Sequence, residues 1–228
     1  MTRAEPRAPG GRSLVAIDGL DGSGKSRFAG ALASACEAEG APAVFLFRVD
    51  DFRRPLADIP AGADEAAIYY ERYYDFALLD DCLRRFLGGA PGVSIPRFDP
   101  DREILEGTRE LQFGGAGLAL LEGVFVLRSP TVATGTLVLL EVTEEEARRR
   151  ILARDTARGR SDASVEHRMN NRYFPAQRAY RAAFDPLRRA DVVIDNEQWG
   201  APRLLRPEKE MIRVPALVGR ALRRVVPS

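Results

Sequence analysis

The sequence has little of what several classes of protein require. Its 228 residues include one histidine and two cysteines, so neither a metal cluster built on these residues nor a disulfide framework is expected. The formal net charge is +1, with acids and bases interspersed, which argues against nucleic acid or a membrane surface as a partner. No apolar run approaches the length of a membrane span. These absences favour a cytoplasmic protein.

The few residues of these scarce types have ordinary structural interpretations. Cys36 and Cys82 lie beside apolar neighbours in helix-like stretches, which predicts small core residues. His167 lies in a polar stretch and is predicted to be exposed on a helix. Residues 1–12 are polar and rich in proline, glycine and arginine, which is typical of a flexible tail and not of a signal peptide.

What the sequence does contain is an alternation of apolar runs with helical patterns. This alternation predicts the α/β class, a parallel sheet sandwiched by helices in a single domain. A long helix is expected over Asp64–Leu87, a small hairpin between Pro91 and Phe113, and a helix that begins with a capping box at Thr143. The expected strands are Leu14–Ile17, Ala43–Val49, Leu118–Leu121, Leu137–Val142 and Val192–Ile194.

Residues 19–26 read GLDGSGKS, the pattern G-x-x-x-x-G-K-[ST], between a predicted strand and a predicted helix. The glycines let the backbone turn so that its N–H groups, with the helix N-terminus, point at a polyphosphate. Lys25 then reaches the β- and γ-phosphates, and Ser26 completes a Mg²⁺ shell. The residues predicted to bind nucleotide here are Gly19, Asp21, Gly22, Ser23, Gly24, Lys25, Ser26 and Arg27.

Acidic residues follow two of the other predicted strands. In a parallel sheet, ligands bind beyond the carboxyl ends of the strands, where Asp50, Asp51 and Glu122 are expected. Transfer of a phosphoryl group to a hydroxyl needs a base that orients the attacking oxygen, and it needs Mg²⁺ held in place. We expect Asp50 to be the base and Glu122 to bind Mg²⁺ or its water, while Asp51 caps a loop.

An arginine-rich stretch follows the capping box. Arg154, Arg158 and Arg160 are predicted to belong to a lid over about 154–163 that brings positive charge to the migrating phosphoryl group. Arg158 is further expected to contact the nucleotide. Arg148 and Arg149 fit a solvated helix face. The run has no interleaved aromatic residues, so nucleic acid is not expected as its ligand.

Four segments in this order resemble the uridine kinase and phosphoribulokinase-like family of P-loop kinases. They are Ile17 through Ser26, Val49-Asp50-Asp51-Phe52, Leu121-Glu122-Gly123-Val124-Phe125, and Arg154-Asp155 with Arg158-Gly159-Arg160. Ile95–Asp99 is similar to the family's hairpin beside the nucleoside pocket, and the resemblance spans about residues 13–205. It implies a P-loop kinase domain over 13–205, after a tail over 1–12 and before a C-terminal extension over 206–228.

The resemblance also implies roles for individual residues. Asp50 would be the catalytic base, with Lys25, Arg154 and Arg160 as further catalytic residues and with Ser26 and Glu122 at the metal. The acceptor would contact Asp50, Phe52, Arg53, Phe98 and Glu122.

The pattern departs from pyrimidine nucleoside kinases around the acceptor. No His-Pro pair follows the Asp-x-Phe motif, Arg53 stands where a tyrosine is often found, and Phe98 replaces a hairpin tyrosine. Arg53, Arg54 and Arg97 could instead meet an anionic acceptor. Surface arginines on loops are an equal alternative.

Together these features predict a kinase that uses ATP and Mg²⁺ to phosphorylate a hydroxyl of a small metabolite, with a nucleoside such as uridine as the first candidate. Pantothenate, a sugar, a sugar phosphate and a nucleoside monophosphate remain alternative acceptors. A nucleotide-binding regulatory switch is the alternative of another class. A homo-oligomer is compatible with the sequence.

Overall fold

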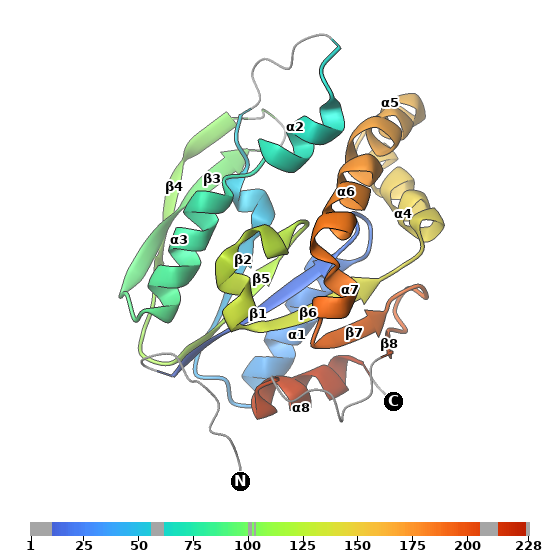
Figure 1. The fold of residues 1–228 in the computed structure, drawn as a ribbon. Coiled ribbons are helices and arrows are strands. Elements are labelled where there is room, and N and C mark those ends of the chain that lie inside the picture. Colours follow the sequence, from blue (N-terminus) through green and yellow to red (C-terminus); the bar gives the residue numbers. More distant parts are fainter. Residues whose placement is uncertain (1–10, 56–61, 100–101, 103, 206–213, 227–228) are drawn as a thin grey trace.

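Within the residues that the structure describes (11–55, 62–99, 102, 104–205 and 214–226), a six-stranded sheet lies at the centre of the fold (Figure 1). This computed structural model gives the strand order β2-β5-β1-β6-β7-β8. All neighbours are parallel except β8, which runs antiparallel to β7. The strands are β1 (Arg12–Gly19), β2 (Val44–Arg48), β5 (Gly117–Glu122), β6 (Thr136–Glu141), β7 (Val192–Asp195) and β8 (Arg203–Leu204). The α/β prediction is therefore confirmed.

The register brings the predicted site residues to one edge of this sheet. Ile17 of β1 lies opposite Glu122 of β5, and Arg48 of β2 lies on the other side of Glu122. The carboxyl ends of β1, β2 and β5 are thus level with one another. Loops that follow these strands meet at this edge, as expected for an open parallel sheet.

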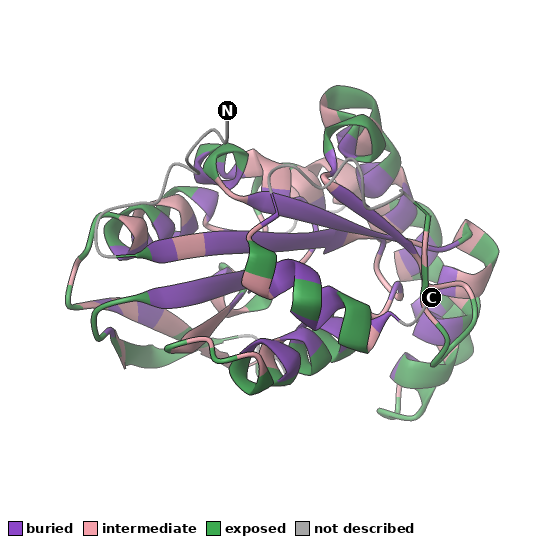
Figure 2. Ribbon diagram, turned by 90° about the horizontal axis from the view of Figure 1, so that it is seen from below, coloured by how far each residue is buried: buried purple, intermediate pink, exposed green. Residues whose placement is uncertain are grey.

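Helices cover both faces of the sheet (Figures 1 and 2), and the strands between them are largely buried. On one face, α1 (Lys25–Ala38) and α8 (Ala216–Val225) pack on side chains such as Ile17 and Leu120. On the other face, α3 (Phe76–Leu87) and α6 (Phe174–Phe184) pack on side chains such as Leu121 and Leu139. The described part of the predicted C-terminal extension is therefore built into the main core.

The packing tests the predictions for the two cysteines and for the end of the predicted tail. Cys36 and Cys82 are buried free thiols within the two large apolar clusters, which confirms them as core residues. Arg12, the last residue of the predicted tail, is instead the first residue of β1 and only 4% exposed. Its guanidinium donates hydrogen bonds to the carbonyls of Phe86, Ala90, Gly114 and Gly115, and these bonds offset the cost of its burial.

The long helix predicted over Asp64–Leu87 is wrong, because the structure has two helices there. They are α2 (Glu65–Glu71) and α3, and the segment between them makes a turn and then an isolated antiparallel bridge between Tyr74 and Arg53. The amide of Arg54 donates to the carbonyl of Tyr73 at 2.9 Å, and the amide of Asp75 donates to that of Phe52 at 2.8 Å. These bonds replace helical ones. Asp75 also caps α3 by accepting from the Leu78 amide. No periodic pattern reveals this pairing, because its partner lies about twenty residues earlier in the chain.

The remaining elements surround the carboxyl edge of the sheet. The predicted hairpin is confirmed as β3 (Gly92–Asp99) with β4 (Ile104–Gln112). Thr143 caps α4 as predicted, by accepting a hydrogen bond from the amide of Glu146. The other helices are α4 (Glu144–Thr156), α5 (Asp162–Arg168) and α7 (Pro186–Arg189), with 3₁₀ turns η1 (Val49–Phe52), η2 (Val126–Arg128) and η3 (Pro130–Thr134) and one π-helical turn, η4 (Met169–Tyr173).

A small third cluster of apolar side chains holds α4, α5 and η4 against the start of the fold. Ile151, Val165 and Met169 pack with Leu20, which belongs to the glycine-rich loop after β1. The helices on either side of the predicted lid are therefore packed against that loop by a small core of their own. Among the described residues, no helix combines the length and the apolar character that crossing a membrane requires.

Candidate active site

The glycine-rich loop connects the end of β1 to the start of α1. Gly22 and Gly24 have φ angles of 79° and 92°, in the left-handed region that side chains disfavour. A Cβ at Gly22 would lie 2.6 Å from the carbonyl oxygen of Ala147 in α4. One at Gly24 would lie 2.8 Å from the side-chain nitrogen of Asn196 after β7. Both the backbone angle and the close approach of other elements therefore require glycine.

Lys25 lies inside the turn of this loop. Its ammonium donates to the carbonyls of Gly19 and Leu20, at 3.0 and 2.7 Å, and the residue is only 8% exposed. Ser23 is turned inward as well: its amide donates to the Leu20 carbonyl, and its buried hydroxyl has no hydrogen-bond partner among the described residues. The side chain that the loop presents for charge compensation is thus Lys25.

Glu122 lies beside the start of α1. It is 5% exposed, and its carboxyl group shares a hydrogen bond with the Ser26 hydroxyl. Burial raises the pKa of this carboxyl above its usual range, although the nearby charge of Lys25 opposes the shift. A hydroxyl and a buried carboxylate at the foot of a phosphate loop are the oxygen donors that Mg²⁺ prefers, so these residues fit the ion.

Asp50 begins the loop after β2, and its side chain is 63% exposed. One of its oxygens, Oδ1, accepts from Arg53 Nε at 3.2 Å, from Arg53 Nη2 at 2.9 Å and from the Tyr74 hydroxyl at 3.2 Å. Its neighbour Asp51 forms an ion pair with Arg109 of β4 at 2.9 Å. Asp50 is thus held through one oxygen, whereas Asp51 connects its segment to the hairpin through Arg109, a contact that the sequence did not predict.

A cleft of about 740 Å³ brings most of the predicted residues together. Lys25 and Asp50, which are far apart in the sequence, both line it, so the glycine-rich loop and the exposed carboxylate share one space. The predicted residues in its wall are Asp21, Gly22, Gly24, Lys25, Ser26, Arg27, Asp50, Glu122, Arg154 and Arg158.

Phe52 does not line the cleft, and its prediction as an acceptor contact is wrong for this structure. The side chain is 1% exposed and packs within the larger apolar cluster. The turn of η1 is the reason, because it exposes Asp50 while directing Phe52 into the core. Gly19, the last residue of β1, is also not among the residues that line the cleft. A Cβ at Gly19 would lie 2.6 Å from the carbonyl oxygen of Leu140.

Two of the lid arginines are held by one buried carboxylate. Asp155 is fully buried and accepts from Arg154 Nε at 2.7 Å and from Arg160 Nη1 at 2.9 Å. Burial alone would raise the pKa of Asp155, but these two ion pairs hold it below its usual value. Arg154 and Arg158 line the cleft, whereas Arg160, which pairs with Asp155, is not among the residues that line it.

Arg53 and Phe98 lie at the Asp50 end of the site. The Arg53 guanidinium stacks over the rings of Tyr73 and Phe98, with centroid distances of 5.4 and 5.8 Å. It simultaneously binds Asp50 through two of its nitrogens. A planar cation is therefore fixed between two rings and a carboxylate, with the hairpin strand β3 supplying one ring.

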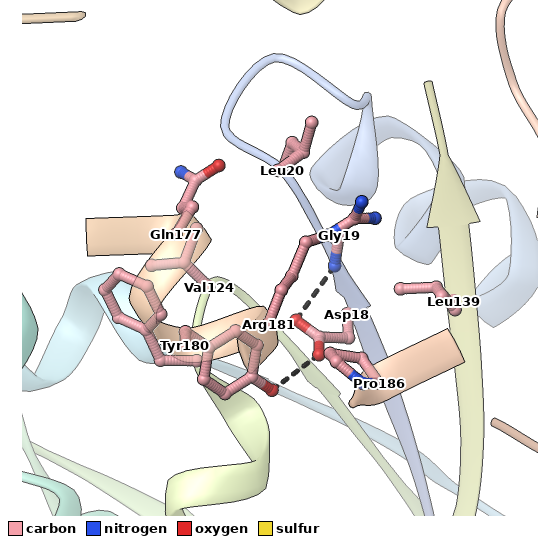
Figure 3. A pocket seen from close by; sticks show the side chains of 10 residues that line it. Asp18, Gly19, Leu20, Val124, Leu139, Gln177, Tyr180, Arg181 and Pro186 are labelled. Atoms are coloured by element: carbon pink, nitrogen blue, oxygen red, sulfur yellow. Dashed lines mark hydrogen bonds between the residues drawn. The ribbon is translucent and has the colours of Figure 1, made fainter. Parts of the chain in front are cut away.

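Behind the loop, Asp18 is buried beneath the first glycine (Figure 3). Its carboxyl accepts from the Tyr180 hydroxyl at 2.6 Å and from the Gly19 amide at 2.9 Å. Burial raises its pKa to about 6, against the opposing effect of these hydrogen bonds and of Lys25. A cavity of about 10 Å³ lies beside it, close to the smallest that holds one water. Its wall also includes Leu20, Val124, Gln177 and Arg181.

Seven residues that line the cleft were not predicted as site residues: Tyr74, Gly123, Val124, Arg149, Arg150, Ala153 and Trp199. Trp199 is 52% exposed, and the guanidinium groups of Arg27 and Arg150 contact its ring, 5.0 and 4.8 Å from the centroid. Arg150 is otherwise fixed by the carbonyls of Asn196 and Glu197. One available signal was that Trp199 closely follows a predicted strand, at the same carboxyl edge as the glycine-rich loop.

Known proteins were compared with the chain as a whole. No family model and no curated protein matches it. A solved structure described as a possible uridine kinase from Bacillus stearothermophilus matches with a TM-score of 0.63 and 25% identity, covering 80% of this chain and 88% of that one. Another, described as a candidate fructose transport system kinase from a Silicibacter species, matches with a TM-score of 0.65 and 25% identity, covering 78% and 88%.

Both matched structures are described as kinases, and each covers most of this chain with the same central sheet and flanking helices. This agreement supports the coarser prediction of a small-molecule kinase with a P-loop. Combined with the four motifs in their family order, it establishes that the chain resembles the uridine kinase and phosphoribulokinase-like family of P-loop kinases.

Proposed function

We propose that this protein transfers the γ-phosphoryl group of ATP to a hydroxyl group of a small metabolite, with a nucleoside such as uridine as the first candidate. The observation that carries the proposal is that Lys25 and Asp50 line the same cleft. Phosphoryl transfer needs compensation of charge on one side and a carboxylate near the acceptor hydroxyl on the other. A regulatory switch would need only the first of these.

ATP would bind along the glycine-rich loop. Lys25 would leave the loop carbonyls for the β- and γ-phosphates, because an anion attracts the ammonium more strongly than a neutral carbonyl does. Trp199 would stack on the base, since its ring is exposed beside Gly24 and already fixed by two arginines. Mg²⁺, held by Ser26 and Glu122, would neutralise phosphate charge.

The acceptor would bind at the Asp50 end of the cleft. All the described hydrogen bonds of Asp50 go to Oδ1, so Oδ2 is the oxygen that would accept the proton of the attacking hydroxyl. Arg154 and Arg158 also line the cleft and would stabilise the charge on the transferring group.

A specific observation favours a second candidate acceptor, a small alcohol that carries a phosphate or carboxylate. The Arg53 guanidinium lies over the rings of Tyr73 and Phe98, so a positive charge is already present at the acceptor end of the cleft. An anionic group could pair with this guanidinium and release Asp50 from it. The sugar phosphates and pantothenate considered from the sequence belong to this class.

Release of ADP, screened across acceptors, tests the proposed function. The panel contains uridine and other nucleosides, thymidylate, pantothenate, neutral sugars and sugar phosphates, each with Mg²⁺ and ATP. We expect release that depends on one class of acceptor and that is lost in Lys25→Ala. Preference for thymidylate would favour a nucleoside-monophosphate kinase. Slow release that no acceptor changes, with a surface that responds to nucleotide, would favour the regulatory switch.

A further inference from the structure

A row of hydrogen-bonding groups connects the two ends of the cleft beneath its surface. The Tyr74 hydroxyl donates to Asp50 at 3.2 Å, and the Tyr69 hydroxyl donates to Asp21 of the glycine-rich loop at 3.0 Å. The two hydroxyl oxygens lie 3.3 Å apart. Asp50 and Asp21 are therefore joined through two side chains only.

Both tyrosines are deeply buried, and their surroundings fix the rings. Tyr69 and Tyr74 are each 3% exposed, and both rings contact Phe125. Burial and the neighbouring carboxylates raise the pKa of both phenols well above the usual value, so each hydroxyl keeps its proton. Each hydroxyl can then still change its hydrogen-bond partner by rotating about its C–O bond.

The number of protons is the important feature of this row. Each hydroxyl has one proton to donate, so two protons serve three contacts: Asp50–Tyr74, Tyr74–Tyr69 and Tyr69–Asp21. When both carboxylates receive a hydrogen bond, the contact between the two oxygens has no proton. When one hydroxyl turns toward the other, one carboxylate loses its bond. The pair thus has alternative arrangements, and each carboxylate influences which one is favoured.

We propose that the Tyr74–Tyr69 pair couples Asp50 to Asp21, so that occupancy of the glycine-rich loop changes how firmly Asp50 is held. This inference rests on the proposed function, because the coupling would change how Asp50 is held when a nucleotide is bound. Asp21 also bonds Gln177 through both its amide and its carboxylate, and the charge of Arg154 acts on it from the lid. A nucleotide bound at the loop would therefore change the hydrogen bonds that Asp21 forms with Tyr69 and Gln177. By reciprocity, a change at Asp50 acts back on the loop.

In this proposal Tyr74 and Tyr69 are positioning residues. Tyr74 touches Asp50 directly, whereas Tyr69 acts through Tyr74. Tyr74→Phe and Tyr69→Phe each remove one hydroxyl and keep the ring, so the aromatic packing is preserved. Tyr70→Phe is the matched control. Tyr70 lies beside Tyr69 in α2 and also packs on Phe125, yet none of the described hydrogen bonds uses its hydroxyl.

The first test needs no ligand. A double-mutant cycle compares the unfolding equilibrium constants of the two single variants with that of the combined variant. Because two protons serve three contacts, removal of one hydroxyl lets the other satisfy its carboxylate without competition. We expect the combined variant to raise the unfolding constant by a factor that differs from the product of the two single factors by about threefold or more. Multiplicative effects would overturn the proposal, whatever the activity of the protein.

The second test uses the non-hydrolysable ATP analogue AMP-PNP with Mg²⁺ as the probe. Amide hydrogen exchange is followed in the glycine-rich loop and in η1, which contains Asp50. In the wild type and in Tyr70→Phe we expect protection of the loop and an exchange rate in η1 that changes by about fivefold. In Tyr74→Phe and Tyr69→Phe the loop should remain protected while the change in η1 disappears.

The results separate this inference from the proposed function. An unprotected loop in the wild type contradicts the proposed function and removes the premise of the coupling. A protected loop with the same change in η1 in all four proteins contradicts the coupling alone.

Discussion

The two sides of the cleft are built in different ways. The P-loop side, formed by residues 19–26, is a contiguous piece of backbone with glycines at close approaches to α4 and to the segment after β7. The Asp50 side is assembled from side chains of separate elements: Asp50 and Arg53 in the segment after β2, Tyr74 between α2 and α3, and Phe98 in the hairpin. The P-loop side is formed by neighbouring residues, whereas the Asp50 side forms only when distant segments come together in the fold.

This difference teaches where specificity can arise. Backbone amides can bind a polyphosphate with any sequence that keeps the glycines, so the P-loop side constrains the donor and little else. Side chains from distant segments can change one at a time, so the Asp50 side is free to vary with the acceptor. Arg53 illustrates this freedom, because its guanidinium lies over the rings of Tyr73 and Phe98, which come from two other segments of the chain.

The largest expected effect separates the two sides through Asp50. Asp50→Asn keeps the shape of the side chain and removes the base, so acceptor-dependent kcat should fall by about 10²- to 10⁴-fold. The affinity for Mg²⁺ and ATP should change far less than kcat, because none of the described hydrogen bonds joins Asp50 directly to the glycine-rich loop, which it reaches only through the Tyr74–Tyr69 pair. Steady-state ADP release and calorimetric titration of nucleotide provide the two measurements.

Asp51→Asn is the matched control for this substitution. Asp51 is adjacent and pairs with Arg109, so its loss should cost no more than a surface ion pair and leave kcat nearly unchanged. Equal loss of turnover and of nucleotide affinity in Asp50→Asn would show that the residue maintains the fold of the cleft and is not the base.

On the P-loop side, Gly22→Ala should destabilise the protein. The new Cβ would lie 2.6 Å from the Ala147 carbonyl at a φ of 79°, and strain of this kind costs about 1–3 kcal/mol. Thermal unfolding should show the loss, together with weaker nucleotide binding. Gly30→Ala provides the comparison, because nothing lies within 4 Å of a Cβ at this position in α1. It should leave stability unchanged or raise it slightly. Equal unfolding temperatures for both variants would contradict the close packing of the loop.

The two sides also differ in how far the sequence predicted them. The strands before Gly19, Asp50 and Glu122 were predicted because continuous apolar runs ended in polar residues at one edge of a parallel sheet. The chemistry of Lys25 and Ser26 followed from eight neighbouring residues. A local pattern with a local cause is readable in this way.

The residues that were missed depend on contacts between distant segments. Tyr74 faces Asp50 because residues 52–54 pair with residues 73–75 and interrupt what reads as one helix. Phe52 was assigned to the acceptor because it stands beside Asp50 in the motif, yet the turn of η1 buries it. The position of Trp199 is fixed by Arg27 and Arg150. Periodicity does not record such partners.

The next prediction concerns stability at acidic pH and the back of the P-loop. Burial raises the pKa of Asp18 from 3.8 to about 6, so the folded protein holds a proton there that the unfolded chain releases. This group therefore stabilises the fold fully below about pH 4, and its contribution is lost as the pH rises toward 6. Asp18→Asn removes this titration, so the stability of the variant relative to the wild type should increase between pH 4 and pH 6. A constant difference, measured by chemical unfolding across this range, would contradict the raised pKa.

The smallest expected effect is at the outer rim of the P-loop side. Trp199→Ala removes the ring that would stack on the base of ATP, a contact of roughly 1 kcal/mol, so the KM for ATP should rise by about five- to tenfold. Turnover at saturating ATP and the KM for the acceptor should remain near the wild-type values. Trp199→Phe, which retains an aromatic face, should recover most of the affinity. A shift in the KM for the acceptor would instead show that Trp199 belongs to the Asp50 side of the cleft.

The central claim is that the cleft joins a triphosphate site to an acceptor site, and the fate of the γ-phosphate tests it most directly. ATP labelled at the γ-phosphate is incubated with Mg²⁺, the protein and each acceptor class in turn, and the labelled products are separated. Our account predicts that the label appears on a hydroxyl group of one acceptor, in an amount equal to the ADP formed. Label found only as inorganic phosphate, at a rate that no acceptor changes, would contradict it.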